Sequence, residues 1–203
     1  MSITPDEVTA VLVTRGNVDL TPILDSLIFD DVVIWDNSCE PTDEMTYGRA
    51  LAIGRGKHAV IYSQDDDIIH SPDNQRRLLA EYQPGVLTGC MWAEWSAGAK
   101  EQGIPDGYDD LVFAGSGSIY DHDIPAIAVN RYLAHYPFDA FFRLWADTIV
   151  GILAPNRQID MRFDALPEAE ADYRMCNLQN GIALKREAIR RARMVRARTM
   201  VAA

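Results

Sequence analysis

Residues 59–69, "AVIYSQDDDII", run from a β-branched apolar segment straight into three consecutive aspartates. A short apolar run that stops at polar residues is typical of a buried strand followed by a turn. Because side chains alternate along a strand, Asp65 and Asp67 are expected on one side and Asp66 on the other. Close carboxylates repel each other, so the run predicts a positive charge nearby. Hard oxygen ligands in this pattern suit Mg²⁺ or Mn²⁺, and a solvated acidic turn before the next helix is the plainer explanation.

The same alternation of apolar runs and turn residues extends through the first half of the chain. It predicts strands at 7–14, 30–38, 58–64 and 85–95, with helices between them at 19–29, 42–57 and 71–83. Continuous apolar strands separated by helices are typical of an α/β protein, with a mostly parallel, doubly wound sheet and helices on both faces.

The second half is less regular. Its pattern predicts a surface loop at 97–110, a short strand and a Gly-Ser turn within 111–125, helices at 125–136 and 138–154, an irregular acidic stretch at 158–181 and a helix at 182–199. A length of 203 residues favours a single domain.

Composition narrows the class of protein. Apolar residues make up 48% of the chain, which is typical of a globular fold and not of a disordered one. No apolar run approaches the roughly 18 residues of a membrane span, and "MSITPDEV" lacks the pattern of a secretory signal. Cys39, Cys90 and Cys176 are far apart and in no C-x-x-C pattern. We therefore expect reduced thiols, a cytoplasmic location and no transmembrane segment.

Polar residues follow three of the expected strands where each strand ends. Arg15 follows the first strand, Asp36 ends the second and Asp65–Asp67 ends the third. In open α/β sheets, ligands bind beyond the carboxyl ends of the strands. These three loops are therefore the expected binding edge.

The order of four segments resembles the nucleotide-sugar half of a GT-A glycosyltransferase, of the family-2-like or exostosin-like kind. The segments are "VLVTRGN" (11–17), "VVIWDNS" (32–38), "YGRALA" (47–52) and "VIYSQDDDI" (60–68). "IWDNS" is also similar to the "WNN" strand end of exostosin-type enzymes. The resemblance covers about residues 8–95 and lies in the order and spacing of the segments.

This resemblance implies a single GT-A domain that uses a UDP- or GDP-sugar. It implies a nucleotide-sugar-binding half (1–95), an acceptor half (96–180) and a basic C-terminal helix (181–203). The metal, Mn²⁺ or Mg²⁺, would be held by Asp67 and Asp65. The implied nucleotide-sugar-binding residues are Thr14, Arg15, Asn17, Asp36, Asn37, Arg49, Asp65, Asp66, Gly115 and Ser116. For Arg49, an ion pair on a helix surface is an equally good explanation.

In the acceptor half, Asp147 stands in an otherwise apolar segment, "FFRLWADTIVGIL". It resembles the acidic segment that supplies the catalytic base of inverting GT-A enzymes, although Ala146 replaces the usual Glu. Burial near apolar groups raises proton affinity, as a general base needs. A helix cap or an ion pair with Arg143 is the structural alternative.

Three further residues are expected at the acceptor. Trp92 and Trp95 could stack on a sugar or a base, and tryptophans at this spacing are as often part of a core. His122 follows the Gly-Ser turn and is a polar candidate beside it. Many GT-A enzymes complete the metal shell with a C-terminal His, but all four histidines here precede Asp147. Water, diphosphate or His122 would have to take that position.

The C-terminal segment has the opposite charge to the body. Residues 181–203 hold six arginines, one lysine and one glutamate, within a chain of net charge −11. An intramolecular role, neutralising the acidic body, competes with binding to nucleic acid or to an anionic membrane surface.

A compact transferase with a basic helix is similar to the viral enzymes that glycosylate hydroxymethylated DNA bases, which would place it in the host cytoplasm. A hydroxymethylated DNA base is therefore the expected acceptor, with DNA bound by the C-terminal helix. Protein, lipid-linked or small-molecule acceptors are the alternatives. An inactive nucleotide-binding GT-A module is the alternative from another functional class.

Overall fold

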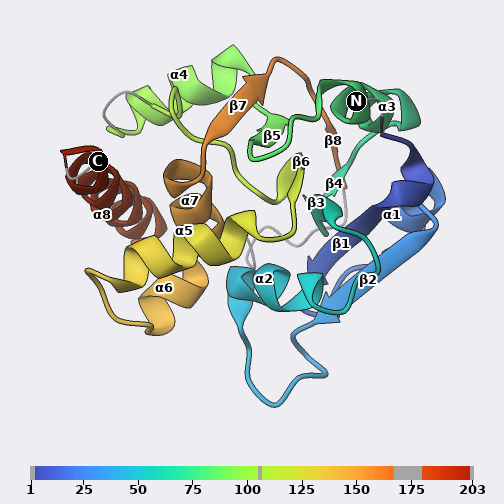
Figure 1. Ribbon diagram of the computed structural model, residues 1–203, viewed down its shortest axis with the longest axis horizontal. Coiled ribbons are helices and arrows are strands. Elements are labelled where there is room, and N and C mark those ends of the chain that lie inside the picture. Colours follow the sequence, from blue (N-terminus) through green and yellow to red (C-terminus); the bar gives the residue numbers. More distant parts are fainter. Residues whose placement is uncertain (1–2, 105–106, 167–179, 202–203) are drawn as a thin grey trace.

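The computed structural model describes residues 3–104, 107–166 and 180–201. Its centre is a six-stranded sheet in the order β2-β1-β3-β6-β5-β7 (Figure 1). The strands are β1 (Val8–Thr14), β2 (Asp31–Asp36), β3 (Val60–Asp65), β5 (Leu87–Cys90), β6 (Ser116–Asp121) and β7 (Asn156–Ile159). β6 is antiparallel to both of its neighbours and every other pairing is parallel. The expected α/β class is confirmed, with a mixed and mostly parallel sheet.

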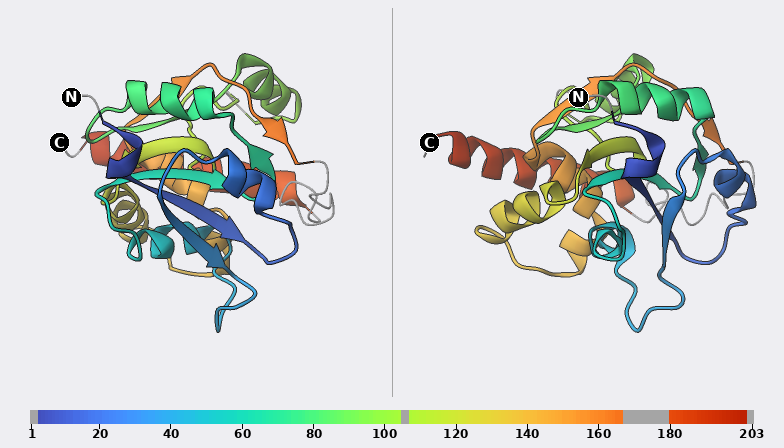
Figure 2. Two further views of the ribbon diagram at one scale, coloured as in Figure 1. Left: turned by 90° about the vertical axis from the view of Figure 1, so that its right-hand side faces the viewer. Right: turned by 45° about the vertical axis from the view of Figure 1, so that its right-hand side comes forward.

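Helices cover both faces of this sheet (Figure 2). They are α1 (Thr21–Ser26), α2 (Gly48–Ile53), α3 (Pro72–Glu81), α4 (Ala93–Glu101), α5 (Ile124–Leu133), α6 (Ala140–Leu144), α7 (Ala146–Leu153) and α8 (Gly181–Val201). Two 3-10 turns, η1 (Pro5–Glu7) and η2 (Met45–Tyr47), and a small second sheet of β4 (Ile68–Ile69) and β8 (Asp164–Ala165) complete the described elements.

Strand periodicity divides the core between the two faces. In β1, Val8 and Ala10 belong to the cluster that includes α3, whereas Val11 packs with α2, α5, α7 and α8. β3 follows the same rule, since Tyr62 lies with the α3 cluster and Ile61 lies with the other. Burial on both faces explains why these strands read as continuous apolar runs.

The structure differs from the sequence expectations at three places. The segment 85–95 is strand only at Leu87–Cys90, and α4 occupies Ala93–Glu101, where the end of that strand and a loop were expected. Helix formers such as Ala, Glu and Lys dominate α4, so local propensity favours the helix. The expected helix 138–154 is broken at Trp145 into α6 and α7.

The third difference concerns the Gly-Ser segment, which starts β6 and is not a turn after a strand. Small polar side chains can occupy this buried strand because their hydroxyls find acceptors. Ser118 Oγ donates to Ala114 O at 2.7 Å, and Ser116 Oγ donates to Phe113 O at 3.0 Å. Satisfied hydroxyls avoid the cost of burying a polar group.

The basic segment forms α8, which packs against α7 and α5. Its buried stripe consists of Ala188, Ile189, Ala192 and Val195, largely as the periodicity predicts. Arg193 and Arg196 both pair with the carboxylate of Asp110 in the body of the domain. Apolar burial and this two-arginine ion pair together hold α8 in place.

The described residues bear on two expectations from the sequence, the one about membrane spans and the one about the cysteines. No helix in the described part of the chain combines the length and the hydropathy needed to cross a bilayer. Cys39 and Cys90 are free thiols, the first exposed and the second buried. Cys176 lies outside the described residues.

The Asp110 pairing predicts a measurable contribution to stability. Replacing Asp110 by Asn should lower the free energy of unfolding by about 1–2 kcal/mol, because two partly buried arginines lose their shared carboxylate. Urea unfolding followed by circular dichroism measures this change. Asp73→Asn is the matched control, since its ion pair with Arg76 is at a side chain that is 93% exposed. Equal midpoints for the two variants would contradict the role given to Asp110.

Candidate functional site

The residues at the carboxyl ends of the parallel strands gather along one edge of the sheet. The register aligns Thr14 with Asp36 and Val13 with Asp65. Because β6 is antiparallel, it contributes its beginning to the same edge, where Ser116 pairs with Gln64. The predicted convergence of these loops at one edge is confirmed.

The aspartate run points to both sides of the sheet. Asp65 contacts the guanidinium of Arg49 on α2, on the face that α7 also covers. Asp66 accepts a hydrogen bond from the Thr14 side chain on β1, and burial raises the pKa of Asp66 above its usual value. The prediction that neighbouring aspartates point in opposite directions is confirmed for this pair.

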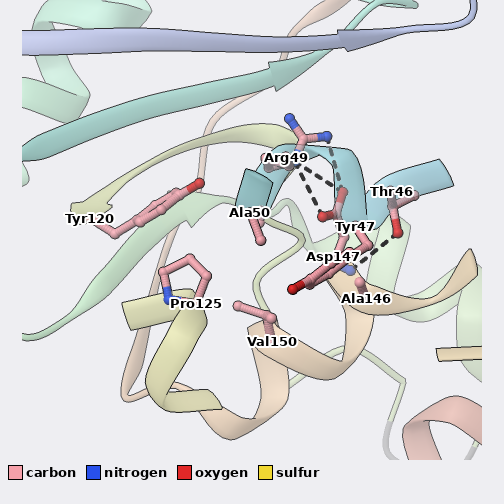
Figure 3. A pocket seen from close by; sticks show the side chains of 10 residues that line it. Thr46, Tyr47, Arg49, Ala50, Tyr120, Pro125, Ala146, Asp147 and Val150 are labelled. Atoms are coloured by element: carbon pink, nitrogen blue, oxygen red, sulfur yellow. Dashed lines mark hydrogen bonds and ion pairs between the residues drawn. The ribbon is translucent and has the colours of Figure 1, made fainter. Parts of the chain in front are cut away.

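Arg49 supplies the positive charge that the aspartate run predicts. Its Nε lies 3.2 Å from both carboxylate oxygens of Asp147, and its Nη2 lies 3.0 Å from Asp147 Oδ2 (Figure 3). Nη2 also contacts Asp65 Oδ1. Its Nη1 donates to the carbonyl of Gln64 at 3.1 Å. The Arg49 side chain is only 3% exposed, so this ion pair is buried and is not on a helix surface.

Gly48 explains how α2 brings Arg49 to this position. A Cβ at Gly48 would overlap the indole ring of Trp35. Glycine therefore lets α2 lie directly against the end of β2, with the next residue directed toward β3 and α7. Glycine has a low helix propensity, yet α2 needs it at position 48 in order to pack against Trp35.

Asp147 lies in the first turn of α7, and its side chain is 12% exposed. Burial raises the pKa of Asp147 to about 6, although Arg49 acts in the opposite direction. The Asp147 backbone N–H donates weakly to Thr46 Oγ1, 3.4 Å away. Arg143 pairs with Glu44 at 3.6 Å, so the suggested partner of Asp147 is wrong and Arg49 replaces it.

A small cavity lies beside Asp147. Its lining includes Tyr47, Tyr120, Pro125 and Val150, and its volume is about 10 Å³ (Figure 3). This volume holds about one water molecule and is far too small for a sugar. Asp65, whose side chain is 44% exposed, can be reached by a larger ligand from the solvent side.

Asn37 is turned inward and braces the loop after β2. Its Oδ1 accepts from Trp35 Nε1 and from the Glu44 backbone N–H, both at 3.0 Å, and its Nδ2 donates to Met45 O at 3.2 Å. These bonds leave the buried Asn37 amide occupied with the protein itself. A direct contact of this amide with a nucleotide would compete with these bonds, and the contact stays a prediction.

The other predicted nucleoside contacts lie nearer the surface. Asp36 accepts from the Ser38 hydroxyl and backbone N–H, and these hydrogen bonds lower the pKa of Asp36. Arg15 lies 3.7 Å from Asp43, and Asn17 is exposed. These side chains remain candidates for contact with a ligand.

Gly115 and Ser116 differ in their roles. A Cβ at Gly115 would overlap the carboxylate of Asp65, whose backbone N–H donates to Gly115 O at 2.6 Å. Glycine is thus required for Asp65 to hold its place. Ser116 is buried, and its hydroxyl donates to Cys90 O at 3.2 Å as well as to Phe113 O.

The three predicted acceptor residues do not form one group. Trp92 and Trp95 stack at 4.8 Å, and Trp92 also meets the Phe163 ring edge-on at 4.9 Å. Both tryptophans are half-buried against the core, which favours the packing interpretation. His122 follows the end of β6. Its backbone N–H donates to the carbonyl of Ala59, the residue that precedes β3. The antiparallel direction of β6 therefore places His122 at the opposite edge, away from Asp65 and from any metal held there.

The metal expectation can be tested against the donor set. Within residues 3–104, 107–166 and 180–201, no group of three or more His, Cys, Asp or Glu side chains is arranged to hold a metal ion. Mg²⁺ sites that bind substrate phosphates use one or two carboxylates and complete the shell with phosphate oxygens and water. Asp65 and Asp67 are the two carboxylates predicted for a site of this second type, and their binding of a metal stays a prediction.

Three residues beside this edge were not predicted from the sequence. Gln64 contributes its carbonyl to Arg49, and Thr46 Oγ1 donates to Arg143 O at 3.0 Å and so ties the loop after β2 to α6. Tyr120 is fully buried, and its hydroxyl donates to Ser63 Oγ at 3.1 Å. Of these three residues, Gln64 alone could have been found from the sequence, because it directly precedes the aspartate run.

The cations of α8 are largely occupied within the chain. Glu187 pairs with Arg190 and Arg191, Asp110 pairs with Arg193 and Arg196, Arg186 donates to Gln102 O, and Lys185 lies over the rings of Tyr108 and Phe113. This arrangement supports the intramolecular role of the basic segment. Binding of DNA by α8 stays a prediction.

Comparisons with known proteins do not identify a family for this chain. No protein-family model matches the chain, and no curated protein shows a significant match.

The contact between Gly115 and Asp65 predicts a sharp glycine requirement. Gly115→Ala should lower the free energy of unfolding by about 1–3 kcal/mol, because the added methyl group has to displace a carboxylate held by Arg49. Gly98→Ala is the control, since a Cβ at that position of α4 meets nothing within 4 Å. Chemical denaturation of both variants measures the difference. A Gly115→Ala protein as stable as the Gly98→Ala protein would show that Asp65 is free to move.

Proposed function

We propose that this protein is a GT-A-type glycosyltransferase, which moves a sugar from a nucleoside diphosphate sugar to an acceptor hydroxyl. The observation that carries the proposal is the position of Asp65. It ends the third strand of the sheet, half-exposed, and is joined through Arg49 to the buried acid Asp147. The partly exposed carboxylate of Asp65 suits a metal ligand, and the buried carboxylate of Asp147 suits a base.

The sheet supports this proposal. Three parallel strands end in polar residues at one edge, and an antiparallel strand begins there, directly after a glycine that lies against Asp65. Asp36 at the end of β2 offers a carboxylate for a nucleoside, and Arg15 and Asn17 lie in the turn after β1. Ligands of α/β sheets bind at such edges.

The charge at the edge favours a cation as cofactor. Asp36, Asp65, Asp66, Asp67 and Asp147 outnumber Arg15 and Arg49. A diphosphate would be repelled by this excess of carboxylates unless a divalent ion joined it. Mn²⁺ or Mg²⁺ held by Asp65 and Asp67 would neutralise the charge that develops on the leaving diphosphate.

In the proposed reaction, the acceptor oxygen bonds to the anomeric carbon as the bond from that carbon to the diphosphate breaks. The hydroxyl proton passes to a base, for which we propose Asp147. Its raised pKa suits this role, and the neighbouring cavity has room for one water molecule. A base can act through one water. Asp147 would then take the proton through this water molecule, without touching a sugar bound on the solvent side of Asp65.

The acceptor is the part of the proposal on which α8 bears. Most α8 cations are paired or lie over aromatic rings, whereas a DNA-binding helix needs cations directed outward. Arg198 is exposed near the end of the helix. Protein, lipid-linked and small-molecule acceptors therefore stand beside a hydroxymethylated DNA base as the classes to be screened.

Donor hydrolysis tests the proposal without a known acceptor. We expect slow, Mn²⁺-dependent release of nucleoside diphosphate from a UDP- or GDP-sugar. Asp67→Ala should abolish it because a metal-binding carboxylate is lost. Asp66→Asn is the matched control and should be tolerated better, since Asp66 is half-buried and accepts a hydrogen bond from Thr14. Binding of nucleotide without any release would favour an inactive nucleotide-binding module, and no binding at all would remove the proposal.

The role of Asp147 predicts a pH dependence. The rate should fall as the pH drops through about 6, because the protonated Asp147 carboxyl cannot take another proton. Asp147→Asn should lower transfer or donor hydrolysis by about 10²–10⁴-fold and remove this acid limb. Rates measured from pH 5 to 9 on both proteins check the prediction. A rate near that of the unchanged protein in Asp147→Asn would place the base elsewhere, or indicate a retaining mechanism.

A further inference from the structure

Arg49 and its two carboxylate partners form a charge group of uneven exposure. The Arg49 side chain is 3% exposed and that of Asp147 is 12% exposed, whereas that of Asp65 is 44% exposed. One cation balances two anions, so the group as a whole is negative. Its only member with substantial contact to solvent is also the proposed metal ligand.

All three donor nitrogens of Arg49 are engaged. Nε and Nη2 hold Asp147, Nη1 holds the carbonyl of Gln64, and Nη2 also contacts Asp65 Oδ1. These contacts come from β3 and α7, so they fix the guanidinium against the Asp65 carboxylate. A cation approaching Asp65 therefore meets a carboxylate that already has a positive partner.

A divalent ion at Asp65 would lie close to this guanidinium, and the two positive charges would repel each other. Burial of Arg49 limits the screening of that repulsion by water and salt. A diphosphate bound to the same ion brings negative charge to the same place and offsets the repulsion. The two ligands should then strengthen each other's binding, as sites joined by a coupling free energy do.

We propose that Arg49 masks Asp65 in the ligand-free protein, so that a divalent cation binds weakly alone and tightly only together with a diphosphate. This inference rests on the proposed function, because it concerns the same edge and the same metal ligand. It assigns Arg49 a positioning role in the order of binding, in addition to its structural role between α2, β3 and α7.

A pair of variants separates masking from simple stabilisation. Arg49→Met/Asp147→Asn removes one buried positive and one buried negative charge, so the net charge of the group is unchanged and Asp65 loses its partner. The double variant also leaves no buried charge uncompensated, which favours folding. Asp147→Asn alone leaves Asp65 as the only carboxylate partner of Arg49, and should strengthen the mask.

Mn²⁺ alone is the first probe, measured by the electron paramagnetic resonance signal of the free ion. We expect the double variant to bind Mn²⁺ about tenfold more tightly than the unchanged protein, within the usual range of coupled sites. Asp147→Asn should bind it more weakly. Adding UDP or GDP should tighten Mn²⁺ binding strongly in the unchanged protein and much less in the double variant. Circular dichroism and thermal unfolding verify that each variant is folded.

Each other outcome decides against the inference in a distinguishable way. Equal Mn²⁺ affinity in the unchanged protein and the double variant, with UDP or GDP enhancing both, would overturn masking and leave the proposed function standing. Absence of Mn²⁺ binding in all proteins, with and without nucleotide, would overturn both. If the double variant does not fold, Asp147→Asn alone is the test, because it leaves the charge of Arg49 opposite Asp65. Mn²⁺ affinity in folded Asp147→Asn equal to that of the unchanged protein would also overturn masking.

Discussion

A buried arginine imposes the main constraint on this structure. Arg49 is almost fully removed from water, so it requires negative partners within hydrogen-bond distance. Asp147 supplies one of them from 98 residues away along the chain, and Asp65 supplies the other from the end of β3. Loss of one partner of such a buried pair typically costs about 3–5 kcal/mol. Helices α2 and α7 are consequently held at one strand end.

The antiparallel strand β6 has an equally direct effect on the edge. Its reversed direction brings its first residue, Ser116, and the preceding Gly115 to the carboxyl ends of the parallel strands. The absence of a side chain at Gly115 gives the Asp65 carboxylate the space that it occupies. The same reversal carries His122 to the far edge. A single change of strand direction therefore decides which polar residues meet.

The basic helix α8 serves the acidic body to which it belongs. Four small or branched apolar residues line its buried stripe, and Asp110 receives two of its arginines. Pairs of this kind satisfy the charge of the helix within the domain. The neutralising interpretation is therefore supported for Arg193 and Arg196, whereas Arg190 and Arg191 pair with Glu187 within the helix.

Local patterns in the sequence determined the class of fold, the strands β1 to β3 and the helices α3 and α8, because each depends on residues close in the chain. The cap that Ser71 provides to α3 is such a local contact. They also indicated that Asp36 and Asp65 each end a strand of the sheet. The tertiary structure alone decided the direction of β6, the break at Trp145 and the pairing of Asp147 with Arg49 instead of Arg143. These depend on contacts between segments that are distant in the chain, such as Arg49 and Asp147, which are 98 residues apart. The need to neutralise a buried guanidinium outweighed the nearer partner.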